Sequence, residues 1–247
     1  MKRADAAHQF LILIPAYNEE GAIAGVIEEV RRVVPGAPIL VVDDASTDST
    51  YRILLNGKID VLRLPYHLGL GGGLQAGYKL AYEFGYDYVI RVDGDGQHDP
   101  KYIPALLETL QKTGCHMVIG SRFQDSNGGY TSIVRALGIW FFRLVLRPIL
   151  GKPVHDPTSG FVGVNREALQ VFRGSFPLEY PEIEALVVLQ RKRFEFREVP
   201  CQMRRRKTGR STITAVKSLY YIFHVLLGVF VNVLKFEGRR KKGIPQK

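Results

Sequence analysis

The sequence predicts an α/β protein with a mostly parallel sheet flanked by helices. Short apolar runs recur along the first half of the chain, at residues 10–14, 39–43, 60–64, 88–92 and 116–120. The stretches between them have apolar residues at helical spacing, at residues 22–33, 49–55, 70–84 and 101–112. Strands buried on both faces that alternate with helices form parallel sheets with right-handed crossovers.

The first apolar run, residues 10–14, follows Met1-Lys2-Arg3 and superficially resembles a secretion signal. It is short, lacks a small-residue cleavage site and leads directly into the polar segment 15–20. We therefore expect it to form the first buried strand of the sheet.

Three of the predicted strands end in acidic segments, at residues 15–19, 43–48 and 93–95. In open parallel sheets, ligands bind beyond the carboxyl ends of the strands. Asp43 and Asp44 are well placed to reach such a ligand. One of Ser46 and Asp48 is expected to cap the following helix.

The segment Asp93-Gly94-Asp95-Gly96-Gln97 is the most informative of the three. Side chains at positions i and i+2 of a strand share a face, so Asp93 and Asp95 can point their oxygens toward one position. Carboxylate and amide oxygens suit a hard divalent ion such as Mg²⁺ or Mn²⁺. An ordinary Asp/Gly turn is the alternative, but the acidic segments at the other strand ends favour a metal site.

The pattern changes after residue 121. Residues 133–150 form a predicted helix rich in aromatic and aliphatic side chains, with Arg135, Arg143 and Arg147 interleaved. Such a helix either packs into the core or lies in a membrane interface. A further helix at residues 182–190 and a strand at 194–199 are expected.

The tail of the chain has a cationic segment, residues 204–211, and an almost wholly apolar run, residues 219–234. A spanning helix needs about 20 apolar residues, so we expect an apolar, membrane-associated C-terminal helix that lies in the interface or docks on a partner. A tilted span is the alternative. The division predicted is a catalytic domain at 1–211 and this helix with its basic tail at 212–247.

Composition limits the partners and the compartment. The formal net charge of +10 favours polyanionic partners, including phosphates, nucleic acid and an anionic membrane surface. The only two cysteines, Cys115 and Cys201, are too few for a disulfide framework or a zinc site, so a reducing compartment is expected.

The chain resembles the family 2 glycosyltransferases of the GT-A type, and most closely the dolichyl-phosphate mannosyltransferase-like group. The matching segments occur in the family's order across roughly residues 10–211 and are highly specific in combination. They are residues 14–20, 41–48, 68–77, 93–98, 121–122 and 158–161. The resemblance implies a nucleotide-sugar donor of the GDP-mannose or UDP-glucose type, and a polyprenyl or dolichyl phosphate acceptor.

The resemblance also implies roles for individual residues on the donor side. The residues expected to line the nucleoside pocket are Pro15, Ala16, Tyr17 and Glu19. Asp43 and Asp44 are expected to bind base and ribose. The residues expected to hold Mg²⁺ or Mn²⁺ against the donor diphosphate are Asp93, Asp95 and Gln97.

Arginines are expected to neutralise the donor or acceptor phosphates, namely Arg122, Arg135 and Arg206. The residues expected to be catalytic are Asp95 and Arg122. Glu182 and Glu184 lie where other subgroups place an acid near the acceptor, although a helix-capping or surface role fits them equally well.

A lipid monophosphate needs no general base, because its second pKa is near 6 and it is largely anionic at neutral pH. Direct, metal-dependent attack with inversion at the anomeric carbon is therefore the expected reaction. The expected location is the cytoplasmic face of a membrane, with the protein acting alone or with a small membrane partner subunit.

Three other functions compete with this one. A glycosyltransferase of this type can instead act on a polysaccharide or another alcohol acceptor. The glycine-rich segment 71–76 matches a loose dinucleotide fingerprint, which an NAD-binding oxidoreductase would use. Binding to nucleic acid is disfavoured, because acidic strand ends repel a phosphate backbone and no recognition element is evident.

Overall fold

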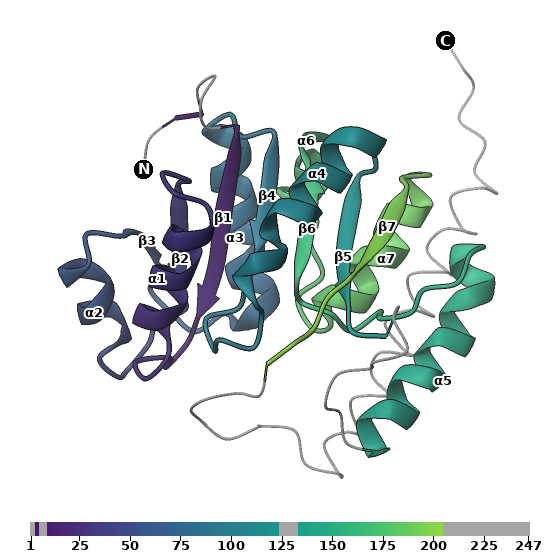
Figure 1. The fold of residues 1–247 in the computed structure, drawn as a ribbon, viewed down its shortest axis with the longest axis horizontal. Helices are drawn as coiled ribbons and strands as arrows, with labels where there is room; N and C mark the ends of the chain where they lie inside the picture. Colours follow the sequence, from purple (N-terminus) through teal and green to yellow (C-terminus); the bar gives the residue numbers. More distant parts are fainter. Residues whose placement is uncertain (1–2, 5–8, 124–132, 205–247) are drawn as a thin grey trace.

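The computed structural model describes residues 3–4, 9–123 and 133–204, which form a seven-stranded sheet with helices on both faces (Figure 1). The strand order is β3-β2-β1-β4-β6-β5-β7, and every pairing is parallel except those of β6, which is antiparallel to β4 and β5. The predicted mostly parallel sheet is confirmed. The strands are β1 (Phe10–Ala16), β2 (Ile39–Asp43), β3 (Asp60–Arg63), β4 (Tyr88–Arg91), β5 (Met117–Ser121), β6 (Val162–Asn165) and β7 (Phe196–Pro200).

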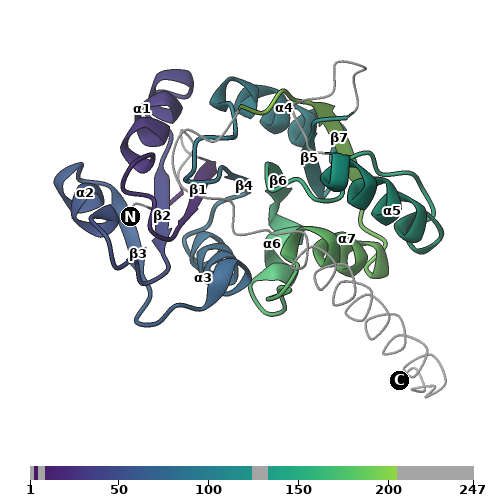
Figure 2. The ribbon, with the colours of Figure 1, turned by 90° about the horizontal axis from the view of Figure 1, so that it is seen from below.

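Helices cover the sheet on both sides, as Figure 2 shows from below, where the parallel strands end. On one side lie α1 (Ile23–Val33) and α4 (Ile103–Thr113), the latter preceded by the short helix η1 (Pro100–Tyr102). On the other side lie α3 (Gly69–Glu83), α6 (Arg166–Phe172) and α7 (Pro181–Arg191). The remaining helices are α2 (Thr50–Asn56), which follows β2, and α5 (Ile133–Leu150), which contacts α7.

The continuous apolar runs of the sequence follow from burial on both faces of the sheet. In β1, Leu11 and Leu13 belong to the hydrophobic cluster under α3, α6 and α7. Ile12 and Ile14 belong to the cluster under α1 and α4. A strand covered on both faces has no solvated side, so apolar and polar residues do not alternate along it.

Two elements were not predicted, namely β6 and α6. The strand β6 is only four residues long and includes Gly163, where an added Cβ would lie 2.7 Å from Ile90 Cδ1 and 2.9 Å from Leu110 Cδ1. The glycine lets β6 fit between β4 and β5 under the side chains of α4. A short strand with an internal glycine lacks the long apolar run that marks the other strands.

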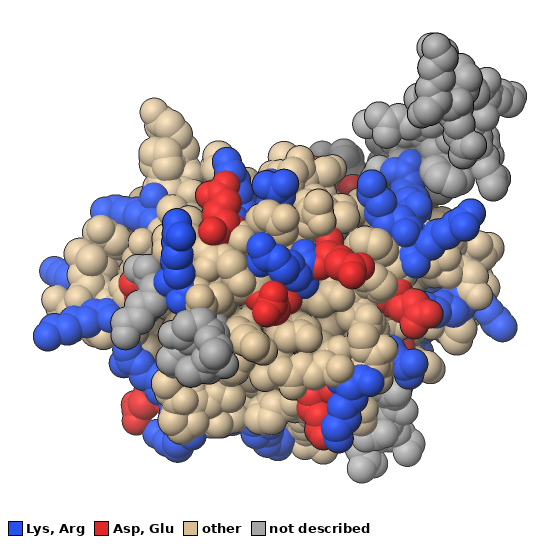
Figure 3. Space-filling model, turned by 90° about the horizontal axis from the view of Figure 1, so that it is seen from above, with Lys and Arg blue, Asp and Glu red and all other residues tan. Residues whose placement is uncertain are grey.

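Lysine and arginine side chains are interspersed with acidic ones on the face where the parallel strands begin (Figure 3). Residues 205–247 hold 11 of the 34 Lys and Arg residues and one of the 24 Asp and Glu residues, so residues 1–204 are formally neutral. The surplus charge that predicts a polyanionic partner therefore belongs to the C-terminal segment.

Within residues 3–4, 9–123 and 133–204, no helix is both long enough and apolar enough to cross a membrane. The predicted apolar helix at 219–234, and the whole segment 212–247, lie outside the described residues.

Candidate active site

A cavity of about 320 Å³ opens at the carboxyl ends of β1, β2 and β4. It is the part of the fold in which the sequence predicts ligand binding. Seven of the predicted site residues line it, namely Pro15, Ala16, Tyr17, Glu19, Asp44, Asp93 and Asp95. The glycine-rich start of α3 also lines it, with Gly69, Leu70 and Gly73, and the remaining lining residues are Val42, His67 and Gly94.

A larger cavity of about 540 Å³ lies between the end of α5 and the start of β7. Its charged lining mixes Lys152, Arg193 and Arg197 with Glu195. Because β7 begins at the edge of the sheet opposite the strand ends, this cavity is remote from the predicted site residues. We therefore assign the candidate active site to the smaller cavity.

Hydrogen bonds join the turn after β1 to the turn after β2. Asn18, at a φ of 55°, donates its N–H to Ser46 Oγ (3.0 Å) and accepts at Oδ1 from the N–H of Thr47 (2.8 Å). Thr50 Oγ1 accepts from the N–H of Glu19 (2.8 Å). The side chains of Asn18, Ser46 and Thr50 thus fix the two turns relative to each other, beside the pocket.

The two candidates for capping α2 have different contacts. Asp48 accepts from the N–H of Thr50 at 2.9 Å and from the N–H of Glu20 at 3.1 Å. Ser46 instead accepts from the turn after β1. The N-cap of α2 is Ser49, whose side chain makes no capping hydrogen bond, so neither candidate is the N-cap. Asp48, one residue earlier, instead binds the N–H of the first helical residue.

Asp44 forms one wall of the pocket together with two aromatic rings. Its Oδ1 accepts from the N–H of Leu68 at 2.7 Å, and its Oδ2 lies 2.9 Å from His67 Nδ1. The His67 ring stacks on Tyr17 with 4.0 Å between centroids. His67 was not predicted, because a single histidine in a loop carries no pattern.

Asp43 is fully buried and is not among the residues that line the cavity. Its Oδ1 accepts from the N–H of Ser46 at 3.2 Å, and its Oδ2 lies 3.4 Å from Arg63 Nε. In this structure Asp43 supports the turn behind the pocket, while its neighbour Asp44 faces the pocket.

The segment after β4 turns sharply at Gly96, whose φ is 77°. Asp95 accepts twice from Gln97, at Oδ1 from the backbone N–H (3.0 Å) and at Oδ2 from Nε2 (2.9 Å). Asp93 and Asp95 line the cavity, whereas Gln97 does not line it but contacts the Asp95 carboxylate. The structure therefore places the two predicted aspartate ligands at the cavity, with Gln97 next to Asp95.

His98 directly follows the predicted metal ligands and supports them from behind. Its Nδ1 accepts from the N–H of Asp93 at 3.0 Å, and its ring stacks on Phe161. Burial lowers the pKa of His98, which keeps the ring neutral and Nδ1 able to accept. His98 thus fixes the backbone at Asp93.

Among the described parts of the chain, no group of three or more His, Cys, Asp and Glu side chains is arranged to hold a metal ion. Two carboxylates and one amide are nevertheless a suitable partial set for Mg²⁺ or Mn²⁺, which usually keep waters and take further ligands from substrate phosphates. The residues present therefore fit a divalent ion that binds together with a phosphorylated ligand.

Arg91 at the end of β4 was missed by the sequence analysis. Its side chain is only 3% exposed, and it pairs with Asp93 and with Glu182 of α7. Burial alone would lower the pKa of Arg91, but the two carboxylates raise it. An added Cβ at Gly160 would lie 2.6 Å from Arg91 Nη2, so a glycine is required beside the guanidinium.

Arg122, a predicted catalytic residue, follows β5 and is bound to the fully buried Asp156. Nε and Nη2 each lie 2.7 Å from a carboxylate oxygen, and Nη2 also donates to Thr158 Oγ1 at 2.9 Å. The guanidinium is therefore held in one orientation on the β5–β6 side of the site.

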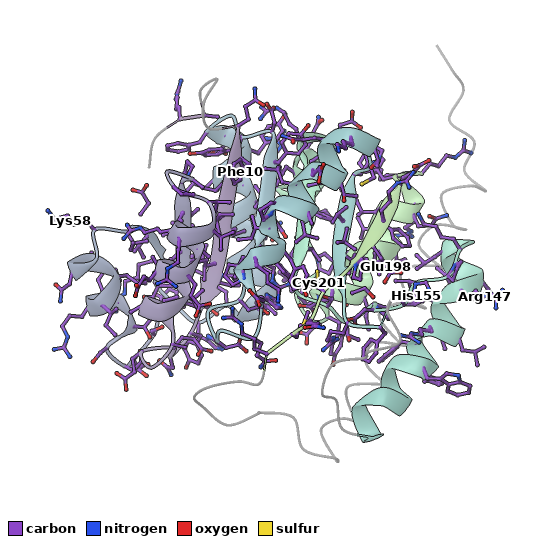
Figure 4. All side chains as sticks on the ribbon, viewed as in Figure 1. Phe10, Lys58, Arg147, His155, Glu198 and Cys201 are labelled. Atoms are coloured by element: carbon purple, nitrogen blue, oxygen red, sulfur yellow. The ribbon has the colours of Figure 1, made fainter. Side chains whose placement is uncertain are left out.

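The turn that carries Asp156 is held by Glu198 of β7. Glu198 accepts from the N–H groups of His155 and Asp156, and its Oε2 lies 2.7 Å from His155 Nδ1. Figure 4 shows Glu198 beside His155. The long-range contact fixes the loop that in turn fixes Arg122.

The side chains of two predicted phosphate-binding arginines are not among the described parts of the structure. The backbone of Arg135 belongs to α5, but its side chain lies outside the description, and Arg206 lies outside the described residues. The chain approaches the site just before Arg206: Arg204 donates its N–H to Gln97 O at 2.9 Å, and Met203 forms an antiparallel bridge with His98.

A mixed α/β sheet of this kind, with a pocket at the strand ends, defines a GT-A-like fold. The crystal structure of glucosyl-3-phosphoglycerate synthase from Mycobacterium tuberculosis, in complex with Mn²⁺, UDP-glucose and phosphoglyceric acid, superposes with a TM-score of 0.71 at 24% identity. The match covers 91% of this chain and 80% of that one. The protein belongs to glycosyl transferase family 2, whose model matches residues 11–172.

Curated relatives are named as glycosyltransferases that act on lipid phosphates. The UDP-N-acetylglucosamine–dolichyl-phosphate N-acetylglucosaminyltransferase of Methanococcus voltae is 29% identical over 239 residues, covering 87% of this chain and 94% of the relative. The undecaprenyl-phosphate mannosyltransferase of Micrococcus luteus is 34% identical over 167 residues, covering 65% and 68%.

Family membership shows that the alternative of an NAD-binding oxidoreductase is wrong. The glycines that suggested it lie inside α3 and serve close packing. An added Cβ at Gly71 would overlap the backbone of Pro177 and Leu178, and one at Gly72 would lie 2.6 Å from Leu68 Cβ.

Proposed function

We propose that this protein transfers a hexose from a nucleotide sugar to a polyprenyl or dolichyl phosphate, with inversion and with a divalent ion. The observation that carries the proposal is that Tyr17, Asp44, Asp93 and Asp95 line the same cavity. It combines an aromatic surface for a base with two acids for a metal-bound diphosphate. The names of the relatives in Methanococcus voltae and Micrococcus luteus support the lipid phosphate acceptor.

The donor binds with its nucleoside between Tyr17 and Asp44 and its diphosphate toward Asp93. A flat ring such as Tyr17 stacks on any nucleobase, while Asp44 accepts hydrogen bonds from base or ribose. Pro15, Ala16 and Glu19 complete the nucleoside wall. Both a guanine and a uracil nucleotide are compatible with this set of groups.

Asp93, Asp95 and Gln97 hold Mg²⁺ or Mn²⁺ in this scheme. When bound, the ion neutralises the negative charge that develops on the departing diphosphate. The hydrogen bonds from Gln97 keep the Asp95 carboxylate in one orientation, so the protein does not reorganise during the reaction. Asp95 is for this reason our candidate for the most important acid.

The acceptor phosphate binds on the β5–β6 side, where Arg122 is held by Asp156. One phosphate oxygen attacks the anomeric carbon as the bond from that carbon to the donor diphosphate breaks. The oxygen is already anionic, because the second pKa of a phosphate monoester is near 6. No side chain is needed to remove a proton, and Arg122, Arg135 and Arg206 instead hold the phosphate in place.

A membrane-facing orientation is supported by α5. Trp140 is 61% exposed and Leu144 59% exposed on one face of the helix, with the exposed Arg147 one turn further on. Arg147 projects from α5 away from the sheet (Figure 4). Apolar and basic side chains on one helical face are typical of helices that lie in an anionic interface.

The proposed domain division and location agree with this orientation. Residues 1–211 are the catalytic domain, and 212–247 attach it to the cytoplasmic face of a membrane, alone or with a small membrane partner subunit. The surplus positive charge of residues 205–247 suits an anionic leaflet. It does not favour nucleic acid, because the pocket is acidic.

A panel assay tests the function directly. The full chain is incubated with Mn²⁺, a short polyprenyl phosphate and, in separate reactions, GDP-mannose, UDP-glucose or UDP-N-acetylglucosamine. We expect one donor to give a sugar-phospholipid, and EDTA to abolish its formation. Transfer to an alcohol acceptor but not to the lipid phosphate would contradict the proposal, as would full turnover in EDTA.

A further inference from the structure

We propose that Arg91 and Glu182 form a positioning pair that fixes the Asp93 carboxylate and sets how tightly the pocket binds a divalent ion. The inference rests on the proposed metal-dependent function, because Asp93 is one of the ligands proposed for the ion. Neither Arg91 nor Glu182 lines the cavity. Both act on the ion only through Asp93.

The geometry restricts the Asp93 carboxylate. Arg91 Nε lies 2.9 Å from Asp93 Oδ1, and Arg91 Nη1 lies 2.9 Å from Glu182 Oε1. The N–H groups of a guanidinium have fixed directions in one plane. Once Glu182 holds one end of that plane, the other end determines the orientation of Oδ1.

The surroundings keep the guanidinium from moving. Gly160 is so close that a Cβ there would lie 2.6 Å from Arg91 Nη2 and 2.8 Å from Asp93 Oδ2. Tyr78 of α3 is fully buried and interacts electrostatically with Arg91, Glu182 and Asp93. The pair is therefore enclosed between β4, α3, α7 and the chain that leads into β6.

The charges explain why a second acid is needed. One buried arginine beside one aspartate is a neutral pair, and a neutral pair attracts a cation weakly. With Glu182 added, the three side chains carry a net charge of −1. Glu182 therefore offsets the positive charge of Arg91, and Asp93 can present negative charge to the pocket.

Glu182→Gln tests this electrostatic role, because glutamine keeps the acceptor oxygen for Arg91 and removes only the charge. The full chain is titrated with Mn²⁺ in the presence of GDP, and separately of UDP, and free Mn²⁺ is measured by electron paramagnetic resonance. We expect the apparent Kd for Mn²⁺ to rise about tenfold, between the limits that Coulomb's law gives for water and for a protein interior.

Glu179→Gln is the matched control. It makes the same change in charge at an exposed position just before α7. We expect it to bind Mn²⁺ as the wild type does. Thermal unfolding of each variant is recorded, so that a loss of Mn²⁺ binding can be separated from a loss of folded protein.

Arg91→Lys tests the geometric role. Lysine keeps the charge but lacks the planar group that joins two carboxylates. We expect the Mn²⁺ affinity to change less than the turnover, which falls about tenfold because Asp93 is no longer held in one orientation.

An unchanged Mn²⁺ affinity in Glu182→Gln, even with a lower melting temperature, would overturn the inference and reduce the pair to a structural role. If Mn²⁺ binding depends on Glu182 but the wild type makes no sugar-phospholipid, the inference stands and the proposed acceptor is wrong. A wild-type chain that binds no Mn²⁺ with either nucleotide would overturn both.

Discussion

Two acids on the β1–β2 side of the pocket are held differently from the acid that orients Arg122 on the β5–β6 side. On the β1–β2 side, Asp44 and Asp48 accept hydrogen bonds from backbone N–H groups, those of Leu68, Thr50 and Glu20. On the β5–β6 side, the fully buried Asp156 is paired with the Arg122 guanidinium. Asp93 lies at the boundary and is paired with Arg91.

The difference determines what is left behind when an acid is replaced. A backbone N–H that loses its acceptor near the surface can bind water. A buried guanidinium that loses its carboxylate is left as an uncompensated charge, which costs about 3–5 kcal/mol. Replacing Asp44 should therefore affect ligand binding more than stability, and replacing Asp156 should affect stability strongly.

The largest effect is expected for Asp95→Ala, which should lower the rate of sugar-phospholipid formation by about 1,000-fold, or about 4 kcal/mol of transition-state stabilisation. The reason is the loss of a proposed metal ligand. Asp95 accepts two hydrogen bonds from Gln97, two residues further along the chain, and each contributes about 1 kcal/mol, so the free energy of unfolding in urea should fall by about 2 kcal/mol or less.

Glu28→Gln, in an exposed helical ion pair with Arg32, serves as the control and should retain activity. An Asp95→Ala protein that remains active would contradict the role of Asp95 as a metal ligand. One that loses activity only because it unfolds would show that Asp95 matters to stability as much as the buried acid on the β5–β6 side.

Asp156→Asn should have the largest effect on stability. The carboxylate is fully buried and accepts from three N–H groups of Arg122. Its replacement leaves the guanidinium without a counter-charge, and we expect the free energy of unfolding to fall by about 3 kcal/mol. Urea unfolding followed by circular dichroism measures it.

Glu167→Gln breaks an exposed pair with His116 and should change stability by about 0.5 kcal/mol or less. Equal effects of the buried and the exposed substitution would show that the arginine pairing on the β5–β6 side adds no special cost.

The two sides also differ in how much of them the sequence predicts. The pocket residues follow directly from strands β1, β2 and β4, which are marked by apolar runs buried on both faces. Asp44, Asp93 and Asp95 could therefore be located before the structure was known. Asp43 could not be separated from Asp44, because adjacent residues of a strand end face opposite ways and the sequence does not say which way.

The residues on the β5–β6 side, and Arg91 beside it, are held by contacts between distant parts of the chain, which no local sequence pattern indicates. Arg91 could have been noticed as a lone charge within an apolar run, since a buried arginine needs a partner. Its partner Glu182 is 91 residues further along the chain. The contact between Glu198 and the turn at Asp156 likewise joins residues 42 apart, and β6 was too short to recognise.

Tyr17→Ala tests the β1–β2 side through ligand affinity. Tyr17 stacks on His67 at the pocket wall, and an aromatic ring contributes about 1–3 kcal/mol to binding a nucleobase. We expect the KM for the donor to rise about tenfold and kcat to change little. Tyr17→Phe should restore the wild-type KM, and a phenylalanine variant as weak as alanine would assign the effect to the hydroxyl group instead.

Asp48→Asn should have the smallest effect and a characteristic pH dependence. Burial raises the pKa of Asp48, but hydrogen bonds from Thr50 and from the backbone of Glu20 more than offset it, so the pKa lies below its ordinary value of 3.8. A lowered pKa in the folded state stabilises the protein above the unfolded pKa, and the contribution is lost as the pH falls through the folded pKa.

Because Asp48 is half-buried, wild type should exceed Asp48→Asn in stability by at most about 1 kcal/mol near neutral pH. The difference should shrink as the pH falls below about 4, where the wild-type carboxyl becomes neutral in the unfolded and then in the folded state. Urea unfolding of both proteins at about pH 7 and about pH 3 measures it. A difference that is equal at both pH values would mean that the N–H groups of Thr50 and Glu20 bind the asparagine and the carboxylate alike, and charge would then play no part in holding this turn.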